Sequence, residues 1–324
     1  MTPADLKTAG FEKERPRLLR LAYRMLGSLA EAEDVVQDGW LRWVGVKESV
    51  DAPAAYLTRI VTRLCLDRLK SAKARRETYV GPWLPDPLMG SVDAVETVAD
   101  DVTMTLMLAM ERLSPLERAA FLLHDVFDVP LKEVAATLDR EPAAVRQLAS
   151  RARKNVRAER SRYTLEAAEA DRIARAFFEA VRDGDTATLA GLLAHDVEIH
   201  ADGGGKVSAF RNIIHGIDHA LRLFGHISER NDRLPLLLRT ALIDGLPGYV
   251  SENPDGRIQT TALDVQDGRI RAIYIVRNPE KLAHVAASYS TAELPNSAAR
   301  LTTASHPKQT FGQSALQRTA RKPA

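Results

Sequence analysis

The sequence has one cysteine, no long apolar segment and little net charge. With Cys65 alone the chain cannot form an intramolecular disulfide, which fits a reducing compartment. No run of about eighteen apolar residues occurs, and the N-terminus MTPADLKTAG lacks the pattern of a signal peptide, so we expect a cytoplasmic protein without membrane contact. Because 45 Lys and Arg nearly balance 43 Asp and Glu, a nucleic-acid partner has to be argued from local patches.

The length and the residue patterns predict a multidomain protein. At 324 residues and 45% hydrophobic residues, the chain can build two or three domains with buried cores. Helical patterns dominate residues 11–76 and 103–160, and another helix is expected over 166–182. Three later segments have strand patterns: 196–200, 257–265 and 269–276. We therefore expect two all-α domains followed by an α+β domain.

Two segments differ from this pattern in composition. Residues 77–104 read as a linker, because 77–101 contain six acidic and no basic residues and the stretch GPWLPDP, with three prolines, favours an extended chain. From residue 286 to 324 the chain is rich in Ser, Thr, Ala and Gln. This composition predicts a disordered tail.

Residues 130–157, PLKEVAATLDREPAAVRQLASRARKNVR, have the pattern of a helix-turn-helix. Leu131, Val134 and Leu138 share one face of a short helix, and Pro142 suits the first position of a second helix. The outward face of that second helix carries Arg146, Gln147, Ser150, Arg151, Arg153 and Lys154. Arg and Gln side chains can donate to base edges in the major groove, while flanking cations neutralise phosphates. The alternative is a solvated basic helix in an α-bundle.

The first helical segment contains an acidic stretch and a basic stretch. Seven basic residues stand between positions 59 and 76 against Asp67 alone, and we expect four of them to contact DNA: Arg59, Arg63, Arg68 and Lys70. The acidic stretch suits a basic partner helix through Glu33, Asp34, Val35, Gln37, Asp38 and Trp40. A solvated acidic helix face is the alternative.

These stretches carry a resemblance to a known family. AYRMLGSLAEAEDVVQDGWLRWV (22–44) and YLTRIVTRLCLDRLKSAKARRE (56–77) resemble region 2 of extracytoplasmic-function sigma factors. LSPLERAAFLLHDVFDVPLKEVA and VRQLASRARKNVR resemble region 4 of the same family, in the same order and spacing. The resemblance implies region 2 within residues 1–76 and region 4 within 105–162.

The resemblance also implies functions for these surfaces. The acidic face would bind the clamp coiled coil of the largest subunit of core RNA polymerase, and the two basic surfaces would bind separate elements of promoter DNA. Arg63 stands where many members of the family have Asn, which alters the expected sequence preference of region 2.

The last third, residues 166–285, resembles a SnoaL-like domain, a cone-shaped α+β barrel around a pocket. Three short stretches, WLPDPL, DGGGK and NPEKL, resemble motifs of the sigma factors that carry this extension. In that subgroup the extension acts in cis in place of a separate anti-sigma protein. The residues expected at this regulatory contact are Trp83, Leu84, Pro85, Asp86, Pro87, Asp202, Gly203, Gly204, Gly205, Lys206, Asn278, Pro279, Glu280, Lys281 and Leu282.

Other functions fit the sequence less well. DGGGK is not a Walker loop, because His200 and Val207 occupy positions that require Gly and Ser or Thr. The three glycines instead suit a tight turn pressed against another segment. Glu198, His200 and Asp202 alternate along one strand face and could line the pocket of an enzyme or of a small-molecule sensor fused to a DNA-binding regulator.

A metal site and a cofactor are not expected. HGIDH (215–219) has two His residues but neither the Glu of a zincin nor a third ligand. A DNA-binding regulator that acts without polymerase is a further alternative, which would bind symmetric half-sites alone.

Overall fold

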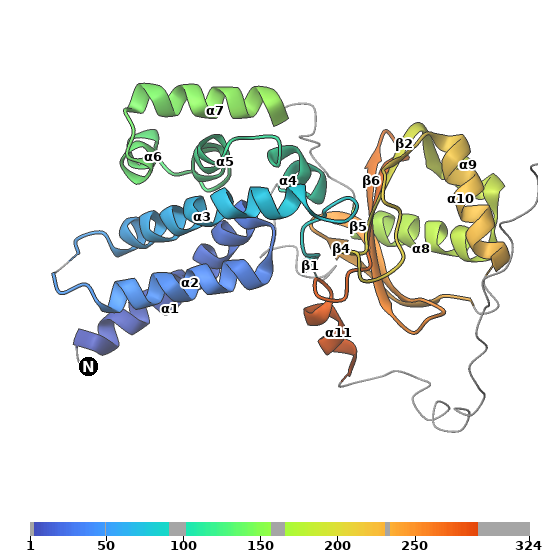
Figure 1. Ribbon diagram of the computed structural model, residues 1–324, viewed down its shortest axis with the longest axis horizontal. Coiled ribbons are helices and arrows are strands. Elements are labelled where there is room, and N and C mark those ends of the chain that lie inside the picture. Colours follow the sequence, from blue (N-terminus) through green and yellow to red (C-terminus); the bar gives the residue numbers. More distant parts are fainter. Residues whose placement is uncertain (1–2, 49, 91–101, 157–165, 231–233, 291–324) are drawn as a thin grey trace, which may run out of the picture. The chain divides into compact units, whose positions relative to one another are not determined.

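The computed structural model describes residues 3–48, 50–90, 102–156, 166–230 and 234–290 (Figure 1). Within these ranges two helical groups precede an α+β domain, as the sequence predicts. No helix within these ranges has the length and apolar character that a membrane span requires.

The first helical group consists of three mutually packed helices: α1 (Pro3–Leu26), α2 (Leu29–Val44) and α3 (Pro53–Glu77). The apolar stripe of α1 is buried, with Leu18, Ala22 and Met25 fully covered. Burial of such stripes is the main source of stability for helices of this kind.

The second helical group contains the predicted helix-turn-helix. Its elements are α4 (Met104–Met110), α5 (Pro115–Phe121), the π-helical turn η1 (Leu122–Val126), α6 (Leu131–Leu138) and α7 (Pro142–Val156). Helix α5 begins at a capping box, in which Ser114 accepts from the Glu117 amide while the Glu117 carboxylate accepts from the Ser114 amide.

The two helical groups share one hydrophobic core, which runs from Phe11 to Val156. Arg118 of α5 is buried, and it donates to the carbonyl oxygens of Met25 (2.8 Å) and Met110 (2.6 Å). Helix α3 also contacts α5 and α6. The groups are therefore packed against each other and do not stand apart.

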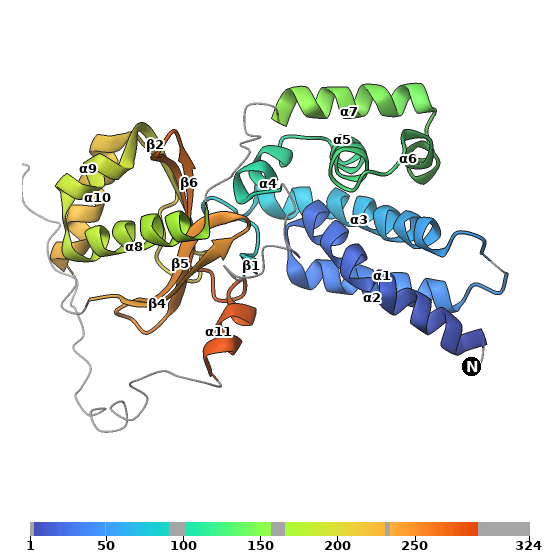
Figure 2. The ribbon, with the colours of Figure 1, turned by 180° about the vertical axis from the view of Figure 1, so that it is seen from behind.

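The C-terminal domain is a curved sheet with helices on one face (Figures 1 and 2). The helices are α8 (Ala167–Asp183), α9 (Thr186–Leu192) and α10 (Ile217–Arg230). The strands are β1 (Met89–Gly90), β2 (Leu193–Asp202), β3 (Ile214–His215), β4 (Leu236–Ile243), β5 (Leu246–Glu252), β6 (Ile258–Gln266) and β7 (Arg269–Val276). Their order is β1-β4-β5-β6-β7-β2-β3, with β2 and β7 parallel, so the described sheet is open and does not close into a complete barrel.

Two features at the ends of this domain differ from expectation. Strand β1 comes from the linker, because Met89 and Gly90 pair with Ile243 and Leu242 of β4. Residues 286–290, expected in the disordered tail, belong to helix α11 (Ala283–Ser290). The rest of that tail, 291–324, lies outside the described residues, as do 91–101 of the linker.

Candidate functional site

The outward face of α7 carries the side chains that the sequence assigns to DNA. Val145, Leu148 and Ala152 are buried beneath the helix, which leaves the predicted DNA-binding residues exposed: Arg146, Gln147, Ser150, Arg151, Arg153 and Lys154. Two of them have acidic neighbours on the preceding elements. Arg151 lies 3.2 Å from Glu117, and Arg153 lies 2.7 Å from Asp125.

The basic surface of α3 is engaged by its neighbours. Arg68 bridges Asp34 and Asp38 of α2 at 3.2 Å each, and Lys70 lies 2.9 Å from Asp67. Arg59 is half-buried, and the Nε of Arg63 lies 3.5 Å from the carbonyl oxygen of Thr137 in α6. The predicted DNA surface of the first helical group therefore contacts the second group at Arg63, which is itself exposed.

The acidic face of α2 is only partly as predicted. Glu33, Asp34 and Gln37 are exposed, whereas Asp38 is half-buried. Trp40 is half-buried against Phe11, with ring centroids 4.9 Å apart. The placement of Val35 on this face is wrong: its side chain is fully buried in the shared core, because it lies on the inward side of the helix.

The WLPDPL stretch lies against the start of α2. The Asp86 carboxylate accepts from the Leu29 amide at 2.8 Å, at the helix N-terminus where a negative charge is favoured. Burial raises the pKa of Asp86, although this amide and Lys281 oppose the shift. The ring of Trp83 fills the space beside Gly27, where a Cβ would lie 2.4 Å from the ring. Pro85 and Pro87 are buried.

Asp202, at the end of β2, binds the linker. Its carboxylate accepts from the Tyr79 hydroxyl at 2.7 Å and from the Leu84 amide at 2.9 Å, and it lies 2.8 Å from the Lys281 ammonium. The Asn278 amide group donates to the Tyr79 hydroxyl at 2.9 Å. We call Tyr79, Leu84, Asp202, Asn278 and Lys281 the Asp202 cluster.

The ammonium of Lys281 is almost completely buried in this cluster. Its side chain is 9% exposed and that of Asp202 is not exposed at all. The ammonium also donates to the Leu84 carbonyl oxygen and lies 4.3 Å from the centroid of the Trp83 ring. Burial removes water from the Lys281 ammonium. The Asp202 carboxylate, the Leu84 carbonyl oxygen and the Trp83 ring take the place of that water.

The DGGGK turn presses on the same linker. Gly204 and Gly205 have φ values of +60° and +70°. A Cβ on Gly204 would lie 2.3 Å from the Asn278 amide nitrogen, and one on Gly205 would lie 3.2 Å from Val80. Glycine is therefore required both by conformation and by close approach.

The remaining residues expected at the regulatory contact have different surroundings. Lys206 pairs with Glu280, and both side chains are exposed. Leu282 is buried and Pro279 is exposed. A Cβ on Gly203 would lie 2.5 Å from the Val207 carbonyl oxygen, so this glycine is required within its own turn.

A second buried carboxylate belongs to Asp244, which no sequence pattern singles out. It lies in the β4–β5 turn and accepts from the Tyr23 hydroxyl at 3.0 Å and from the Leu88 amide at 3.2 Å, while Arg24 lies 3.4 Å away. We call Tyr23, Arg24, Leu88 and Asp244 the Asp244 cluster. Burial raises the pKa of Asp244 to about 6, although Arg24 opposes the shift.

Further contacts join the C-terminal domain to the linker and to α4. The ring of His284 lies 2.8 Å from the carbonyl oxygen of Pro87. The Thr105 hydroxyl donates to Asp264 at 3.1 Å and accepts from the Tyr274 hydroxyl at 3.2 Å. None of these pairs has a sequence signal, because the partners are separated by 159 to 197 residues.

Glu198 and His200 lie on the sheet face away from the helices, as does Asp202. The opposite face of β2 carries Val197, Ile199 and Ala201, which are buried, and Ala201 lines the cavity under the helices. The expectation that Glu198, His200 and Asp202 line the pocket is wrong, because the helices cover the other face of their strand. Burial lowers the pKa of His200, although Glu198, 3.1 Å away, opposes the shift.

A metal centre has no support in the described part of the chain. No group of three or more His, Cys, Asp or Glu residues there is arranged to hold an ion. His215 lies beside Glu198 at 3.4 Å, and the ring of His219 contacts the carbonyl oxygen of His215 at 2.9 Å.

Comparison with known proteins shows which protein regions the two helical groups are similar to. The family models of sigma-70 region 2 and sigma-70 region 4 match residues 11–75 and 103–156. The ECF RNA polymerase sigma factor SigJ of Mycobacterium tuberculosis is 37% identical over 294 residues, which cover 85% of this chain and 93% of SigJ. The chain belongs to the extracytoplasmic-function sigma factors.

Two further comparisons extend to the C-terminal domain of this sigma factor. The probable ECF sigma factor SigI of the same species is 30% identical over 288 residues, which cover 87% of this chain and 97% of SigI. The crystal structure of M. tuberculosis SigJ has a TM-score of 0.69 and 36% identity, and it covers 85% of this chain and 98% of that chain. The fold over 85% of this chain is therefore similar to that of a solved sigma factor.

Membership of this family fixes the general function. Sigma regions 2 and 4 bind core RNA polymerase and promoter DNA, and the protein directs transcription initiation. Sigma factors are not enzymes.

Proposed function

We propose that the C-terminal domain of this sigma factor inhibits it in cis, by holding the linker so that regions 2 and 4 stay packed together. The observation that supports this most strongly is the Asp202 cluster, in which a buried ion pair of the C-terminal domain binds the linker backbone at Leu84. The Asp244 cluster adds a second such contact, which reaches region 2 directly through Tyr23.

The packing of regions 2 and 4 is incompatible with simultaneous reading of two separated DNA elements. The regions share one hydrophobic core, and Arg63 of region 2 faces α6 of region 4. Each region would read its own promoter element, as the family resemblance implies, so the shared core has to open before both can bind. A domain that stabilises the shared core thereby inhibits initiation.

The proposal includes the partner surfaces. Glu33, Asp34 and Gln37 offer an exposed acidic face for the clamp coiled coil of the largest polymerase subunit. Arg68 is bound to Asp34 and Asp38 in the closed protein. A basic polymerase helix that takes over these two carboxylates would release Arg68 for the DNA backbone, which couples the two binding events.

The inhibitory contact is built into the chain, so we propose that no separate anti-sigma protein is required. Run-off transcription with core polymerase tests both statements, with the full chain compared with a chain that ends at residue 165. The shortened chain keeps the complete shared core, which ends at Val156. We expect promoter-specific transcripts from the shortened chain at a lower protein concentration than from the full chain.

Each result of this comparison has a defined meaning. Equal activity of the two chains would contradict cis inhibition and leave the C-terminal domain passive. Binding of the full chain alone to a DNA site with symmetric halves would favour a regulator that acts without polymerase.

A further inference from the structure

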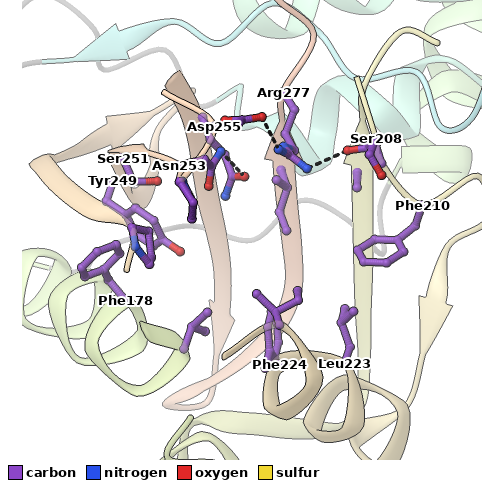
Figure 3. A pocket seen from close by; sticks show the side chains of 18 of the residues that line it. Phe178, Ser208, Phe210, Leu223, Phe224, Tyr249, Ser251, Asn253, Asp255 and Arg277 are labelled. Atoms are coloured by element: carbon purple, nitrogen blue, oxygen red, sulfur yellow. Dashed lines mark hydrogen bonds and ion pairs between the residues drawn. The ribbon is translucent and has the colours of Figure 1, made fainter. Parts of the chain in front are cut away.

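The C-terminal domain encloses a cavity that none of the sigma functions uses. Its volume is about 480 Å³, which lies within the range of about 300–1,000 Å³ typical of small-molecule sites. Its wall is mostly apolar, with Phe178, Phe210, Leu223, Phe224 and Tyr249 among the lining residues (Figure 3). An apolar ligand body of moderate size fits this space.

One cation, Arg277, lies in the wall of the cavity (Figure 3). It donates to the Ser208 carbonyl oxygen at 2.6 Å and lies 3.5 Å from the Asp255 carboxylate. Within the described residues its Nε is buried and has no hydrogen-bond partner. Burial lowers the pKa of Arg277 and Arg257 adds to this effect, whereas Asp255 opposes it. Among the lining residues Arg277 is paired with Asp255, so an anionic ligand has to compete with that carboxylate for the guanidinium.

The loop after β2 forms a wall that the cavity shares with the linker. Ser208, Ala209 and Phe210 line the cavity. On the linker side, a Cβ on Gly81 would lie 3.5 Å from the carbonyl oxygen of Phe210, and one on Gly205 would lie 3.2 Å from Val80. A displacement of this loop therefore acts directly on the linker.

Arg277 also borders the Asp202 cluster. The backbone amides of Arg277 and Asn278 both donate to the carbonyl oxygen of Asp202, at 2.8 and 3.0 Å. The Asn278 side chain in turn donates to Tyr79 of the linker. Arg277 thus connects the cavity wall to the contact that holds the linker.

We propose that the cavity binds an amphipathic carboxylic acid, with the carboxylate on Arg277 and the apolar body among the aromatic side chains, and that binding loosens the linker. The effect on the linker rests on the proposed cis inhibition, whereas the binding itself does not. The carboxylate competes for Arg277 with both of its present partners, the Ser208 carbonyl oxygen and the Asp255 carboxylate. Loss of that bond frees the loop from residue 203 to 210, which weakens its contacts with Val80 and Gly81.

Isothermal titration calorimetry of the full chain tests the ligand class. The probes are octanoate, octanol and octylammonium, which share one apolar body and differ in charge. We expect octanoate to bind at least about tenfold more tightly than octanol, because a hydrogen bond to a charged group is stronger than one between neutral groups, and octylammonium to bind most weakly. Equal affinity for the acid and the alcohol, or no binding of either, overturns the proposal without any variant.

Two variants locate the site. Arg277→Gln removes the charge, and we expect it to abolish the preference for octanoate over octanol. Phe210→Ala removes a half-buried ring outside the hydrophobic core, and we expect it to weaken both ligands by a similar factor. An unchanged preference in Arg277→Gln contradicts the assignment of Arg277, and equal binding by Phe210→Ala and the parent contradicts the location.

Hydrogen exchange and transcription test the effect on the linker. With saturating octanoate we expect faster exchange of the amides from Tyr79 to Leu88, and more run-off transcript from the full chain. If the chain that ends at residue 165 is active while octanoate changes neither exchange nor transcription, the coupling fails and cis inhibition stands. If octanoate binds and speeds exchange but the full and shortened chains transcribe equally, cis inhibition fails and the ligand site stands.

Discussion

Removal of the Asp202 carboxylate is the sharpest perturbation of the proposed inhibitory contact. In Asp202→Ala the Lys281 ammonium keeps the Leu84 carbonyl oxygen and the Trp83 ring but loses its counter-ion. Removal of one partner of a buried ion pair costs about 3–5 kcal/mol. Since Lys281 is 9% exposed and can move toward solvent, we expect the lower value of about 3 kcal/mol, which shifts the closed-to-open equilibrium on the order of 100-fold.

Exchange of the Leu88 amide hydrogen measures this shift, because this linker amide donates to Asp244, an acceptor that Asp202→Ala leaves in place. We expect its exchange to be about 100-fold faster in Asp202→Ala, and run-off transcription from the full chain to rise. Lys206→Ala is the matched control on the same turn. Its ion pair with Glu280 is exposed and worth about 0–1 kcal/mol, so exchange at Leu88 should change less than about fivefold.

A double-mutant cycle separates the ion pair from other effects of Asp202, which also accepts from the Gly204 amide within its own turn. The cycle consists of Asp202→Leu, Lys281→Met and their combination, which replaces both charges by apolar groups; such a replacement is often neutral or stabilising for buried pairs. We expect the double variant to be less open than Asp202→Leu. The reasoning is refuted if Asp202→Ala leaves both Leu88 exchange and transcription within twofold of the parent, with exchange in strands β6 and β7 unchanged.

Three further predictions concern other contacts. The pKa of Asp244 is about 6 in the folded protein against an ordinary 3.8, so its stabilising effect is complete below pH 3.8 and is lost as the pH rises through 6. The free energy of unfolding of the parent, measured by urea titration, should fall over this range by up to about 3 kcal/mol relative to that of Asp244→Asn. Gly204→Ala places a Cβ against Asn278 at a position with positive φ, so it should lower the melting temperature. Gly191→Ala, whose Cβ would lie in open space within α9, should leave the melting temperature equal or raise it. Equal effects of the two substitutions would contradict the close approach of Gly204 to Asn278. Arg146→Ala should cost about 1–3 kcal/mol of promoter binding at one base pair if Arg146 reads a base, and an equal loss on all promoter variants would assign it to a phosphate.

Features set by local sequence could be predicted. The helix-turn-helix follows from apolar spacing within a few turns, and the structure places Val145, Leu148 and Ala152 beneath α7 as that spacing requires. The DGGGK turn was equally predictable, because consecutive glycines suit positive φ whatever the rest of the fold. In both cases the physical cause lies within the segment itself.

Features set by distant partners could not be predicted in this way. Asp244 and Tyr23 are 221 residues apart, and an isolated Asp before a Gly signals only a turn. The two residues of β1 are too few for any periodicity. The strand pattern of β2 correctly put Glu198, His200 and Asp202 on one face, but which face the helices cover depends on packing across the whole sheet. Val35 is a second example: its place in a helix could be predicted, but not that its side chain faces the shared core.

The linker divides its hydrogen bonds between two partners, and this division indicates where activation has to act. Asp86 binds region 2 through the Leu29 amide and the Gly27 carbonyl oxygen, whereas Leu84 and Leu88 bind the C-terminal domain. The bond to Leu29 caps α2, and loss of such a cap costs about 0.5–2 kcal/mol of helix stability. Release on the region 2 side would therefore weaken the helix that carries the acidic polymerase face. A productive signal therefore has to break the contacts with Asp202, which involve no residue of region 2. Loss of Asp244 would instead remove a partner of the buried Tyr23 and Arg24 side chains of region 2.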